Sequence, residues 1–181
     1  MDLGLKAKNV LVTGGSKGIG LAVAELFADE GANVAICARN ADEVAKVVTG
    51  LAGKGVKAWG QGVDVADPVA LKGWVEGAAS ELGGIDCIVC NVSALAVGDT
   101  PETWEKSFRT DMMHTVNSVA AALHGGFHSL DTTGEQLVVL TLIQGVRGQP
   151  GRGTVEQRGN RVSGRQLARL TEPRAGAEHQ Q

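Results

Sequence analysis

The chain has 181 residues, a formal net charge of −3 and 26 glycines, and it contains no tyrosine. Its hydrophobic fraction of 43% and charged fraction of 20% are ordinary for a globular domain, and its length suits one domain with a sizeable core. No run approaches the roughly 18 apolar residues of a membrane span, and the start lacks the apolar core of a signal peptide, so we expect a cytoplasmic protein. The absence of tyrosine excludes any mechanism in which a tyrosine is the acid.

Charge divides the chain near residue 146. Residues 146–181 carry seven arginines, three glutamates and no lysine, whereas residues 1–145 carry ten basic and 17 acidic side chains. The second segment has few large apolar residues and cannot bury enough surface to offset its chain entropy. We therefore predict a globular domain over residues 1–145 and a disordered, arginine- and glycine-rich tail over residues 146–181.

The first elements alternate between strand and helix. Asn9–Val12 is a short apolar run that predicts a buried strand, and Val34–Ala38 predicts a second one. Between them, from Gly18 to the closing Gly31, apolar residues recur at helical spacing. The face predicted to be buried consists of Ile19, Ala22, Val23, Leu26 and Phe27.

Two further helices have recognisable starts. Asn40 and Glu43 have the spacing of a capping box, followed by a helix that carries Val44, Val47, Val48 and Leu51. A third strand is predicted within residues 56–65. Asp67 then caps a helix with Pro68 at its first position, and its apolar face comprises Leu71, Trp74, Val75, Ala78 and Leu82.

The later elements continue the alternation. Residues 85–90 predict a fourth strand, a long helix starts at Thr100, and residues 136–143 predict a fifth strand. The long helix carries Trp104, Phe108, Met112 and Val116 at steps of four. Regular alternation with helical crossovers implies a parallel sheet covered on both faces. Right-handed crossovers then give a doubly wound α/β fold, with a ligand crevice outside the carboxyl ends of the strands.

Neither a redox pair nor a metal site is predicted. Cys87 and Cys90 form a C-x-x-C, but residues three apart on a buried strand point to opposite faces, so these thiols should not meet. His124 and His128 have a metal-binding spacing on a helix, but two glycines lie between them and no acidic ligand is suitably placed. We expect no bound metal.

The loop between the first strand and the first helix is the main functional motif. Residues 13–20 read Thr-Gly-Gly-Ser-Lys-Gly-Ile-Gly, with three glycines in the spacing G-x-x-x-G-x-G. Gly14 permits a tight turn, Gly18 permits the close approach of a ligand, and Gly20 permits close packing of the helix on the strand. Backbone amides at such a helix N-terminus bind phosphate. The alternative is a tight turn without a ligand.

These residues resemble the classical short-chain dehydrogenases/reductases. Thr13–Gly20 resembles that family's T-G-x-x-x-G-x-G loop, and residues 62–65, Gly-Val-Asp-Val, resemble its third-strand motif, in which Asp64 holds the adenine ring. Of the family's N-N-A-G turn after the fourth strand, Asn91 is retained. The resemblance covers residues 6 to about 150. It implies a Rossmann-type dinucleotide-binding domain over residues 1–145, with the sheet truncated after the fifth strand.

The end of the second strand predicts NADP(H) rather than NAD(H). NAD sites place a carboxylate there to bind the ribose hydroxyls, but residues 37–40 read Cys-Ala-Arg-Asn and offer none. Arg39 can pair with a 2′-phosphate, and Lys17 lies on the neighbouring loop. The alternative for Arg39 is a solvated loop residue. The predicted cofactor-binding residues are Gly14, Ser16, Lys17, Gly18, Ile19, Gly20, Arg39, Asn40, Asp64, Val65 and Asn91.

The catalytic residues that the resemblance implies are missing. The family transfers hydride between NADPH and a carbonyl or alcohol, using a Tyr-x-x-x-Lys pair, a serine and an asparagine. Asp111 stands at the asparagine position and Leu142, beside Thr141, at the serine position, while the tyrosine and lysine positions fall near Val155 and Gly159. Arginine stays protonated and cannot replace them. We therefore assign no catalytic residue and predict an NADP(H)-binding protein with impaired catalysis.

Two other functions stay open. The chain could be an active NADP-dependent oxidoreductase with unorthodox or partner-supplied groups, or a non-enzymatic interaction protein. Nucleic-acid binding through the tail arginines is disfavoured, because the tail has no aromatic residue and the body is acidic. The similarity stops near Gly151, and we hypothesise that a frameshift replaced the original C-terminal part. The DNA downstream of that codon would test this.

The truncated sheet also predicts self-association. Its fifth strand becomes an exposed edge, and apolar edges pair with other chains. The helix over residues 100–123 is a second candidate interface, because the resembled family pairs its subunits through it. We therefore expect a homo-oligomer or an aggregation-prone protein.

Overall fold

The computed structural model describes residues 3–96, 98–125 and 138–141. The predicted tail over residues 146–181, the position of His128 and the segment after Thr141 lie outside these residues. Within them the chain alternates strands and helices as predicted: β1 (Asn9–Thr13), α1 (Gly18–Asp29), β2 (Asn33–Ala38), α2 (Ala41–Ala52), β3 (Ala58–Gly62), α3 (Pro68–Leu82), β4 (Cys87–Cys90), α4 (Pro101–Ser107), η1 (Phe108–Met113), α5 (His114–Gly125) and β5 (Val138–Thr141).

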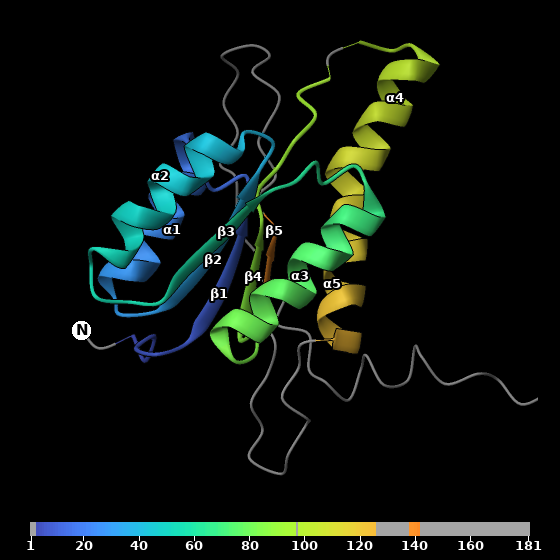
Figure 1. The fold of residues 1–181 in the computed structure, drawn as a ribbon. Helices are drawn as coiled ribbons and strands as arrows, with labels where there is room; N and C mark the ends of the chain where they lie inside the picture. The colour runs from blue at the N-terminus through green and yellow to red at the C-terminus, as the bar shows by residue number, and fades with distance from the viewer. Residues whose placement is uncertain (1–2, 97, 126–137, 142–181) are drawn as a thin grey trace, which may run out of the picture.

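The strands form one parallel sheet in the order β3-β2-β1-β4-β5. The chain moves outward from β1 to β3, then returns to the other side of β1 for β4 and β5 (Figure 1). This reversal places a topological switch point between β1 and β4, where open α/β sheets hold their ligands. The predicted Rossmann-type doubly wound fold is confirmed.

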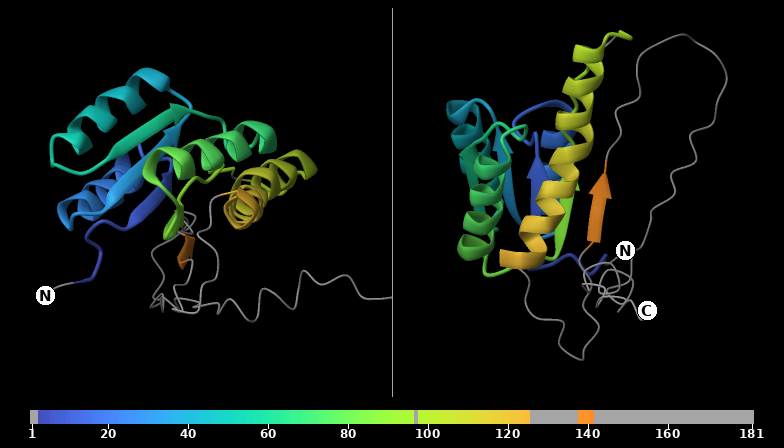
Figure 2. Two further views of the ribbon diagram at one scale, coloured as in Figure 1. Left: turned by 60° about the horizontal axis from the view of Figure 1, so that its bottom comes forward. Right: turned by 90° about the vertical axis from the view of Figure 1, so that its right-hand side faces the viewer.

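Helices cover both faces of the sheet, and each face has its own core. Helices α1 and α2 lie on one side, and α3 lies with α5 on the other (Figure 2). Alternate strand residues point to the two sides: Val10 and Val12 pack with α1 and α2, whereas Leu11 packs with α3 and α5. The alternation separates the two cysteines as predicted, since Cys87 lies in the first core and Cys90 in the second.

Two helix starts follow the sequence signals. The Asp67 carboxylate accepts hydrogen bonds from the amides of Val69 and Ala70 at 2.9 and 3.1 Å. The Asn40 side chain caps α2 by accepting from the amides of Asp42 and Glu43 at 3.0 and 3.1 Å. The capping box is only half formed, however, because the Glu43 carboxylate contacts the glycine loop instead.

The predicted buried face of α1 is only partly correct, because Val23 and Phe27 pack against the core whereas Ile19 and Leu26 do not. Ile19 and Leu26 are 55% and 65% exposed, and the buried residues of the helix are Gly20, Ala24 and Ala28. A Cβ atom added at Gly20 would lie 2.2 Å from the Gly14 carbonyl oxygen, so the helix axis runs close to the loop and strand. At that separation only small side chains fit directly between helix and sheet, and the larger Val23 and Phe27 are only partly buried against the same core.

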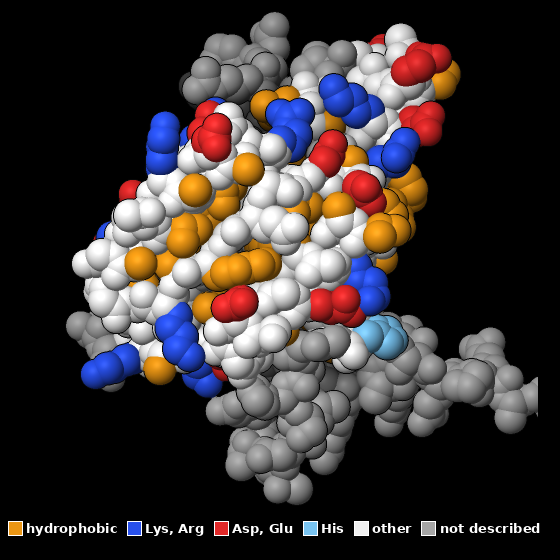
Figure 3. Space-filling view, in the orientation of Figure 1, with side chains coloured by type: hydrophobic (Ala, Val, Ile, Leu, Met, Phe, Trp, Pro, Cys, Tyr) orange, Lys and Arg blue, Asp and Glu red, His pale blue; other side chains and the backbone are white. Residues whose placement is uncertain are grey.

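The predicted long helix is present but changes its winding. Helix α4 leads into the π-helical segment η1, and α5 follows directly. Helix α5 packs on α3 and β4, whereas Trp104, Phe108, Met112 and Val116 are each more than half exposed. These four exposed side chains, spaced four residues apart along α4, η1 and α5, form an apolar stripe, and Figure 3 shows hydrophobic side chains exposed along the edge of the molecule where these helices lie. The stripe is therefore a surface of the chain rather than part of its core.

Candidate functional site

The glycine loop turns sharply between β1 and α1. Gly14 and Gly18 have φ values of +67° and +60°, which side-chain-bearing residues rarely adopt. A Cβ atom at Gly18 would meet no atom within 4 Å, so the backbone there faces open space. Gly15, which the sequence analysis did not single out, is also required, because a Cβ atom would lie 2.6 Å from the Cγ2 atom of Ile36.

The start of α1 is open to an anion. No side chain caps this 12-residue helix, and its first turn contains no acidic residue. The first amides of a helix lack intrahelical partners and carry a partial positive charge, so an uncapped start favours negative groups. The loop and the helix start together form a site that fits a phosphate.

Asn91 fixes the loop to the end of β4. Its backbone N–H donates to the Thr13 hydroxyl at 2.9 Å. Its side-chain nitrogen donates to the carbonyl oxygens of Thr13 and Gly14 at 3.2 and 3.4 Å. The buried Oδ1 atom of Asn91 has no hydrogen-bond partner among the described residues. Asn91 therefore holds the switch point together and leaves one acceptor for another group.

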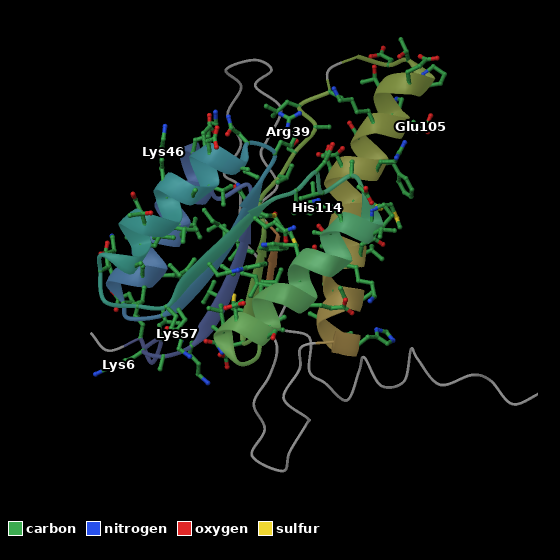
Figure 4. The ribbon with its side chains drawn as sticks, in the orientation of Figure 1. Lys6, Arg39, Lys46, Lys57, Glu105 and His114 are labelled. Carbon is green, nitrogen blue, oxygen red and sulfur yellow. The ribbon has the colours of Figure 1, made fainter. Side chains whose placement is uncertain are left out.

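A cavity of about 810 Å³ lies at the carboxyl ends of the strands. Charged side chains of both signs gather over this end of the molecule, and Arg39 lies there beside the end of β2 (Figures 3 and 4). The lining residues are Gly14, Lys17, Ala38, Arg39, Asn40, Glu43, Val63, Asp64, Val65, Ala66, Val92, Ser93, Ala94, Glu102, Glu105, Lys106, Arg109 and Thr110.

The structure brings most of the predicted site together. Of the predicted cofactor-binding residues, Gly14, Lys17, Arg39, Asn40, Asp64 and Val65 line the cavity. Asn91 stands directly behind Gly14, while Ser16, Gly18, Ile19 and Gly20 continue the loop and the start of α1 without lining the cavity. Residues from four separate parts of the sequence therefore meet at one end of the sheet.

Asp64 and Val65 follow β3 in a tight turn. The Asp64 carboxylate accepts from the Ala66 amide at 3.0 Å, which fixes the direction of its exposed side chain. Val65 and Val63 are about 5% exposed or less and support the turn from below. The turn places a carboxylate at the wall of the cavity.

A carboxylate also stands beside the proposed phosphate contacts. Glu43, in the first turn of α2, lines the cavity and forms an ion pair with Lys17, with Oε1 3.1 Å from Nζ. Its Oε2 atom accepts from the Ser16 hydroxyl at 3.4 Å. The strand end itself has no carboxylate, as noted from the sequence, but the fold supplies one from the next helix.

The far wall of the cavity was not identified from the sequence. It consists of Glu102, Glu105, Lys106, Arg109 and Thr110, on α4 and the start of η1. The Asp111 carboxylate in η1 accepts from the Ala94 amide at 2.6 Å and so ties this wall to the segment after β4. Extra backbone turns of π type are frequent at functional sites. The helical periodicity of the sequence gives no signal for this π-helical segment.

Behind the site lies a buried histidine. His114 is 1% exposed, its Nε2 atom lies 3.4 Å from the Thr13 hydroxyl, and its Nδ1 atom contacts the Thr110 carbonyl oxygen. Burial lowers the pKa of His114 below its usual value, although the Thr110 carbonyl and Asp111 act in the opposite direction. The neutral ring therefore links the π-helical segment to the end of β1.

The cysteines are buried and unreactive in character. Burial raises the pKa of Cys37 and Cys87 to about 12 and that of Cys90 to about 11. Thiols with such pKa values are poor nucleophiles and poor metal ligands at neutral pH. Among the described residues, no group of three or more His, Cys, Asp or Glu side chains could hold a metal ion, and His124 contacts the Ala120 carbonyl at 2.7 Å.

Only some of the positions that the family resemblance implies for catalysis lie within the described residues. Asp111 lies in η1 and is engaged with Ala94, as described above. Thr141 ends β5, while Leu142 and the positions near Val155 and Gly159 lie outside the described residues. None of the described helices is both long enough and apolar enough to span a membrane.

Comparison with known proteins identifies the family of the chain. A family model described as "short chain dehydrogenase" matches residues 8–151. Isoepoxydon dehydrogenase patN of Penicillium expansum is 42% identical over 125 residues, which cover 67% of this chain and 48% of that protein. The chain spans about half the length of the curated relatives it matches.

Solved structures show the same architecture. A short chain dehydrogenase from Burkholderia cenocepacia in complex with NADP has a TM-score of 0.66 and 31% identity, covering 75% of this chain and 55% of that one. The L-sorbose reductase of Gluconobacter frateurii, solved with NADPH and L-sorbose, has a TM-score of 0.64 and 34% identity, covering 68% of this chain and 49% of that one.

Proposed function

Because the chain belongs to the short chain dehydrogenase family, we propose that it binds NADP(H) in the cavity at the carboxyl ends of the strands. The observation that carries this proposal is the meeting of Gly14, Lys17 and Arg39 around one cavity, next to the uncapped start of α1. Related proteins of 31% and 34% identity were solved with NADP and NADPH. The family's reaction is hydride transfer between NADPH and a carbonyl or alcohol, and the nicotinamide supplies the hydride when bound.

Each part of the site has a role in holding this cofactor. Phosphate groups fit the amides at the start of α1, where Gly18 leaves open space. Asp64 and Val65 lie where the family holds the adenine ring. Asn91 keeps the glycine loop against β4 through its hydrogen bonds to Thr13 and Gly14.

The preference for NADP(H) over NAD(H) rests on Arg39. This exposed residue follows β2 directly, lines the cavity and forms no ion pair with any described residue. A guanidinium binds a phosphate through paired, charge-assisted hydrogen bonds, whereas it gains little from ribose hydroxyls. A 2′-phosphate on the adenosine ribose is the group that fits it.

We further propose that the 181-residue chain has impaired catalysis. It contains no tyrosine, and its last lysine is Lys106. The acid/base pair of the family therefore has no counterpart in this sequence. The buried His114 does not replace it, because both ring nitrogens contact the protein's own Thr13 and Thr110. General acid–base catalysis requires a titratable group within reach of the substrate.

The test is a fluorescence titration of the full chain with NADPH and NADH. Arg39→Gln should weaken NADPH binding about tenfold and leave NADH binding unchanged, since the charge-assisted bonds to one phosphate are lost. Lys46→Gln is the matched control. Lys46 is an exposed cation on α2, the helix that follows Arg39, and its side chain does not line the cavity (Figure 4).

The same preparation should not oxidise NADPH when a panel of carbonyl compounds is added. Absence of NADPH binding up to millimolar concentrations would refute the binding proposal. Steady NADPH consumption with any carbonyl compound would refute the proposed impairment and favour an active enzyme with unorthodox groups.

A further inference from the structure

Glu43 engages two polar side chains of the glycine loop, those of Lys17 and Ser16. Its Oε1 atom lies 3.1 Å from the Lys17 ammonium, and its Oε2 atom accepts from the Ser16 hydroxyl at 3.4 Å. Lys17 and Glu43 are 26 residues apart, and the fold brings them together because β1 and β2 end side by side. The carboxylate is therefore held between the start of α2 and the loop before α1.

The position of Glu43 opposes the charge of the site around it. Lys17, Arg39 and Glu43 all line the same cavity, and the carboxylate is paired with Lys17, one of the cations that a 2′-phosphate there could contact. A phosphate in this part of the cavity must compete with Glu43 for Lys17 and must also approach a like charge. A ribose with a free 2′-hydroxyl meets neither obstacle, and a carboxylate can accept a hydrogen bond from it.

We infer that Glu43 is a specificity-determining residue that limits the preference for NADP(H) over NAD(H) by holding Lys17 and Ser16. This inference rests on the proposed cofactor site. Arg39 favours the phosphorylated cofactor, Glu43 disfavours it, and the balance between these two neighbouring side chains sets the selectivity. The strand-end motif contains only the first of them.

The experiment measures binding of two adenosine fragments to the full chain by calorimetry. Adenosine 2′,5′-bisphosphate and adenosine 5′-monophosphate differ only in the 2′-phosphate, and neither requires a nicotinamide pocket. Glu43→Gln should tighten binding of the bisphosphate about three- to tenfold, because it frees Lys17 and removes a like charge. Binding of the monophosphate should change less than about twofold.

Asp42→Asn is the matched control. It removes the same charge from the neighbouring position of the same helix turn, but Asp42 is exposed and does not line the cavity. The control should leave the ratio of the two affinities unchanged. In a Lys17→Gln background, the gain from Glu43→Gln should be smaller, because only the removal of the like charge then contributes.

The possible failures are distinct. If neither fragment nor NADPH binds to the unmodified chain, the proposed function itself is wrong. If the fragments bind but Glu43→Gln and Asp42→Asn shift the affinity ratio equally, or if Glu43→Gln weakens the bisphosphate, the inference is overturned while the proposed function stands. A gain from Glu43→Gln that is just as large without Lys17 also overturns it.

Discussion

His114 shows how one side chain can make stability depend on pH. It joins the end of β1 to the π-helical segment through Thr13 and Thr110, and its ring is almost completely buried. A charged imidazole would lose its hydration there, which is why its pKa is lowered. The neutral ring is thus part of the folded structure, and protonation favours the unfolded chain.

The expected consequence is a loss of stability in mild acid. The unfolded chain binds a proton at His114 near pH 6.5, whereas the folded chain does so only at lower pH. The free energy of unfolding should therefore fall as the pH drops below about 6.5, by at most about 1.4 kcal/mol per pH unit for this group. The fall should stop once the pH is below the folded-state pKa.

Urea unfolding between pH 5 and pH 8 checks this. His114→Gln should flatten the pH dependence across the window below pH 6.5, although the variant is less stable at every pH. His124→Gln replaces an exposed histidine on the same helix and should leave the dependence intact. An unchanged slope in His114→Gln would contradict the assignment.

At the scale of elements, the approach of α1 to the sheet is fixed by small residues. Gly20, Ala24 and Ala28 form the buried side of the helix, and Gly20 touches the Gly14 carbonyl. The close approach holds the start of α1 next to Gly14, which lines the cavity. The packing of one helix therefore decides where the uncapped amides at its start lie.

Adding one methyl group should disturb this contact. In Gly20→Ala the new Cβ atom would lie 2.2 Å from the Gly14 oxygen and 2.5 Å from Asn91 Nδ2, so α1 or the loop must shift. We expect a loss of about 1–3 kcal/mol in the free energy of unfolding, together with weaker NADPH binding.

Gly73→Ala is the control for glycine replacement in a helix. Gly73 lies in α3, and a Cβ atom there meets nothing within 4 Å, so the change should stabilise the chain by about 0.5–1 kcal/mol. The two midpoints in urea should thus move in opposite directions. A Gly20→Ala variant with wild-type stability would mean that α1 does not pack this closely in solution.

At the scale of the molecule, the chain presents two surfaces for self-association. The apolar stripe of Trp104, Phe108, Met112 and Val116 runs along α4, η1 and α5, and β5 is an outer strand of the described sheet. An exposed apolar patch together with an outer strand is typical of association surfaces. We propose that a second copy of the chain binds through the stripe.

A charge in the middle of the stripe tests this proposal. Met112→Lys should shift the chain toward monomer in light-scattering measurements at tens of micromolar protein, because a lysine ammonium would be desolvated in the contact. Val69→Lys changes an apolar residue on α3 that is even more exposed than Met112, and it should have no effect. A monomeric unmodified chain, or an equal response of both variants, would count against the stripe.

The sequence by itself determined the order of the elements and the identity of the loop. Apolar runs of strand length, helical periodicity and the caps at Asn40 and Asp67 are local signals, and the structure follows them. The glycine spacing likewise depends on backbone conformation over a few residues, which is why Gly14 and Gly18 could be assigned their roles beforehand.

Only the tertiary structure decided which side of α1 is buried, which partner Glu43 takes and which residues form the far wall of the cavity. Periodicity favoured a face that includes Ile19 and Leu26, but the fully buried positions are Gly20 and two alanines, with Val23 and Phe27 partly buried. Glu43 contacts Lys17 because the neighbouring parallel strands β1 and β2 end side by side. No local sequence pattern encodes a contact between residues 26 positions apart. Local sequence determines the backbone conformation of each element. The charges that face one another in the cavity, such as Lys17 and Glu43, depend on which elements pack side by side.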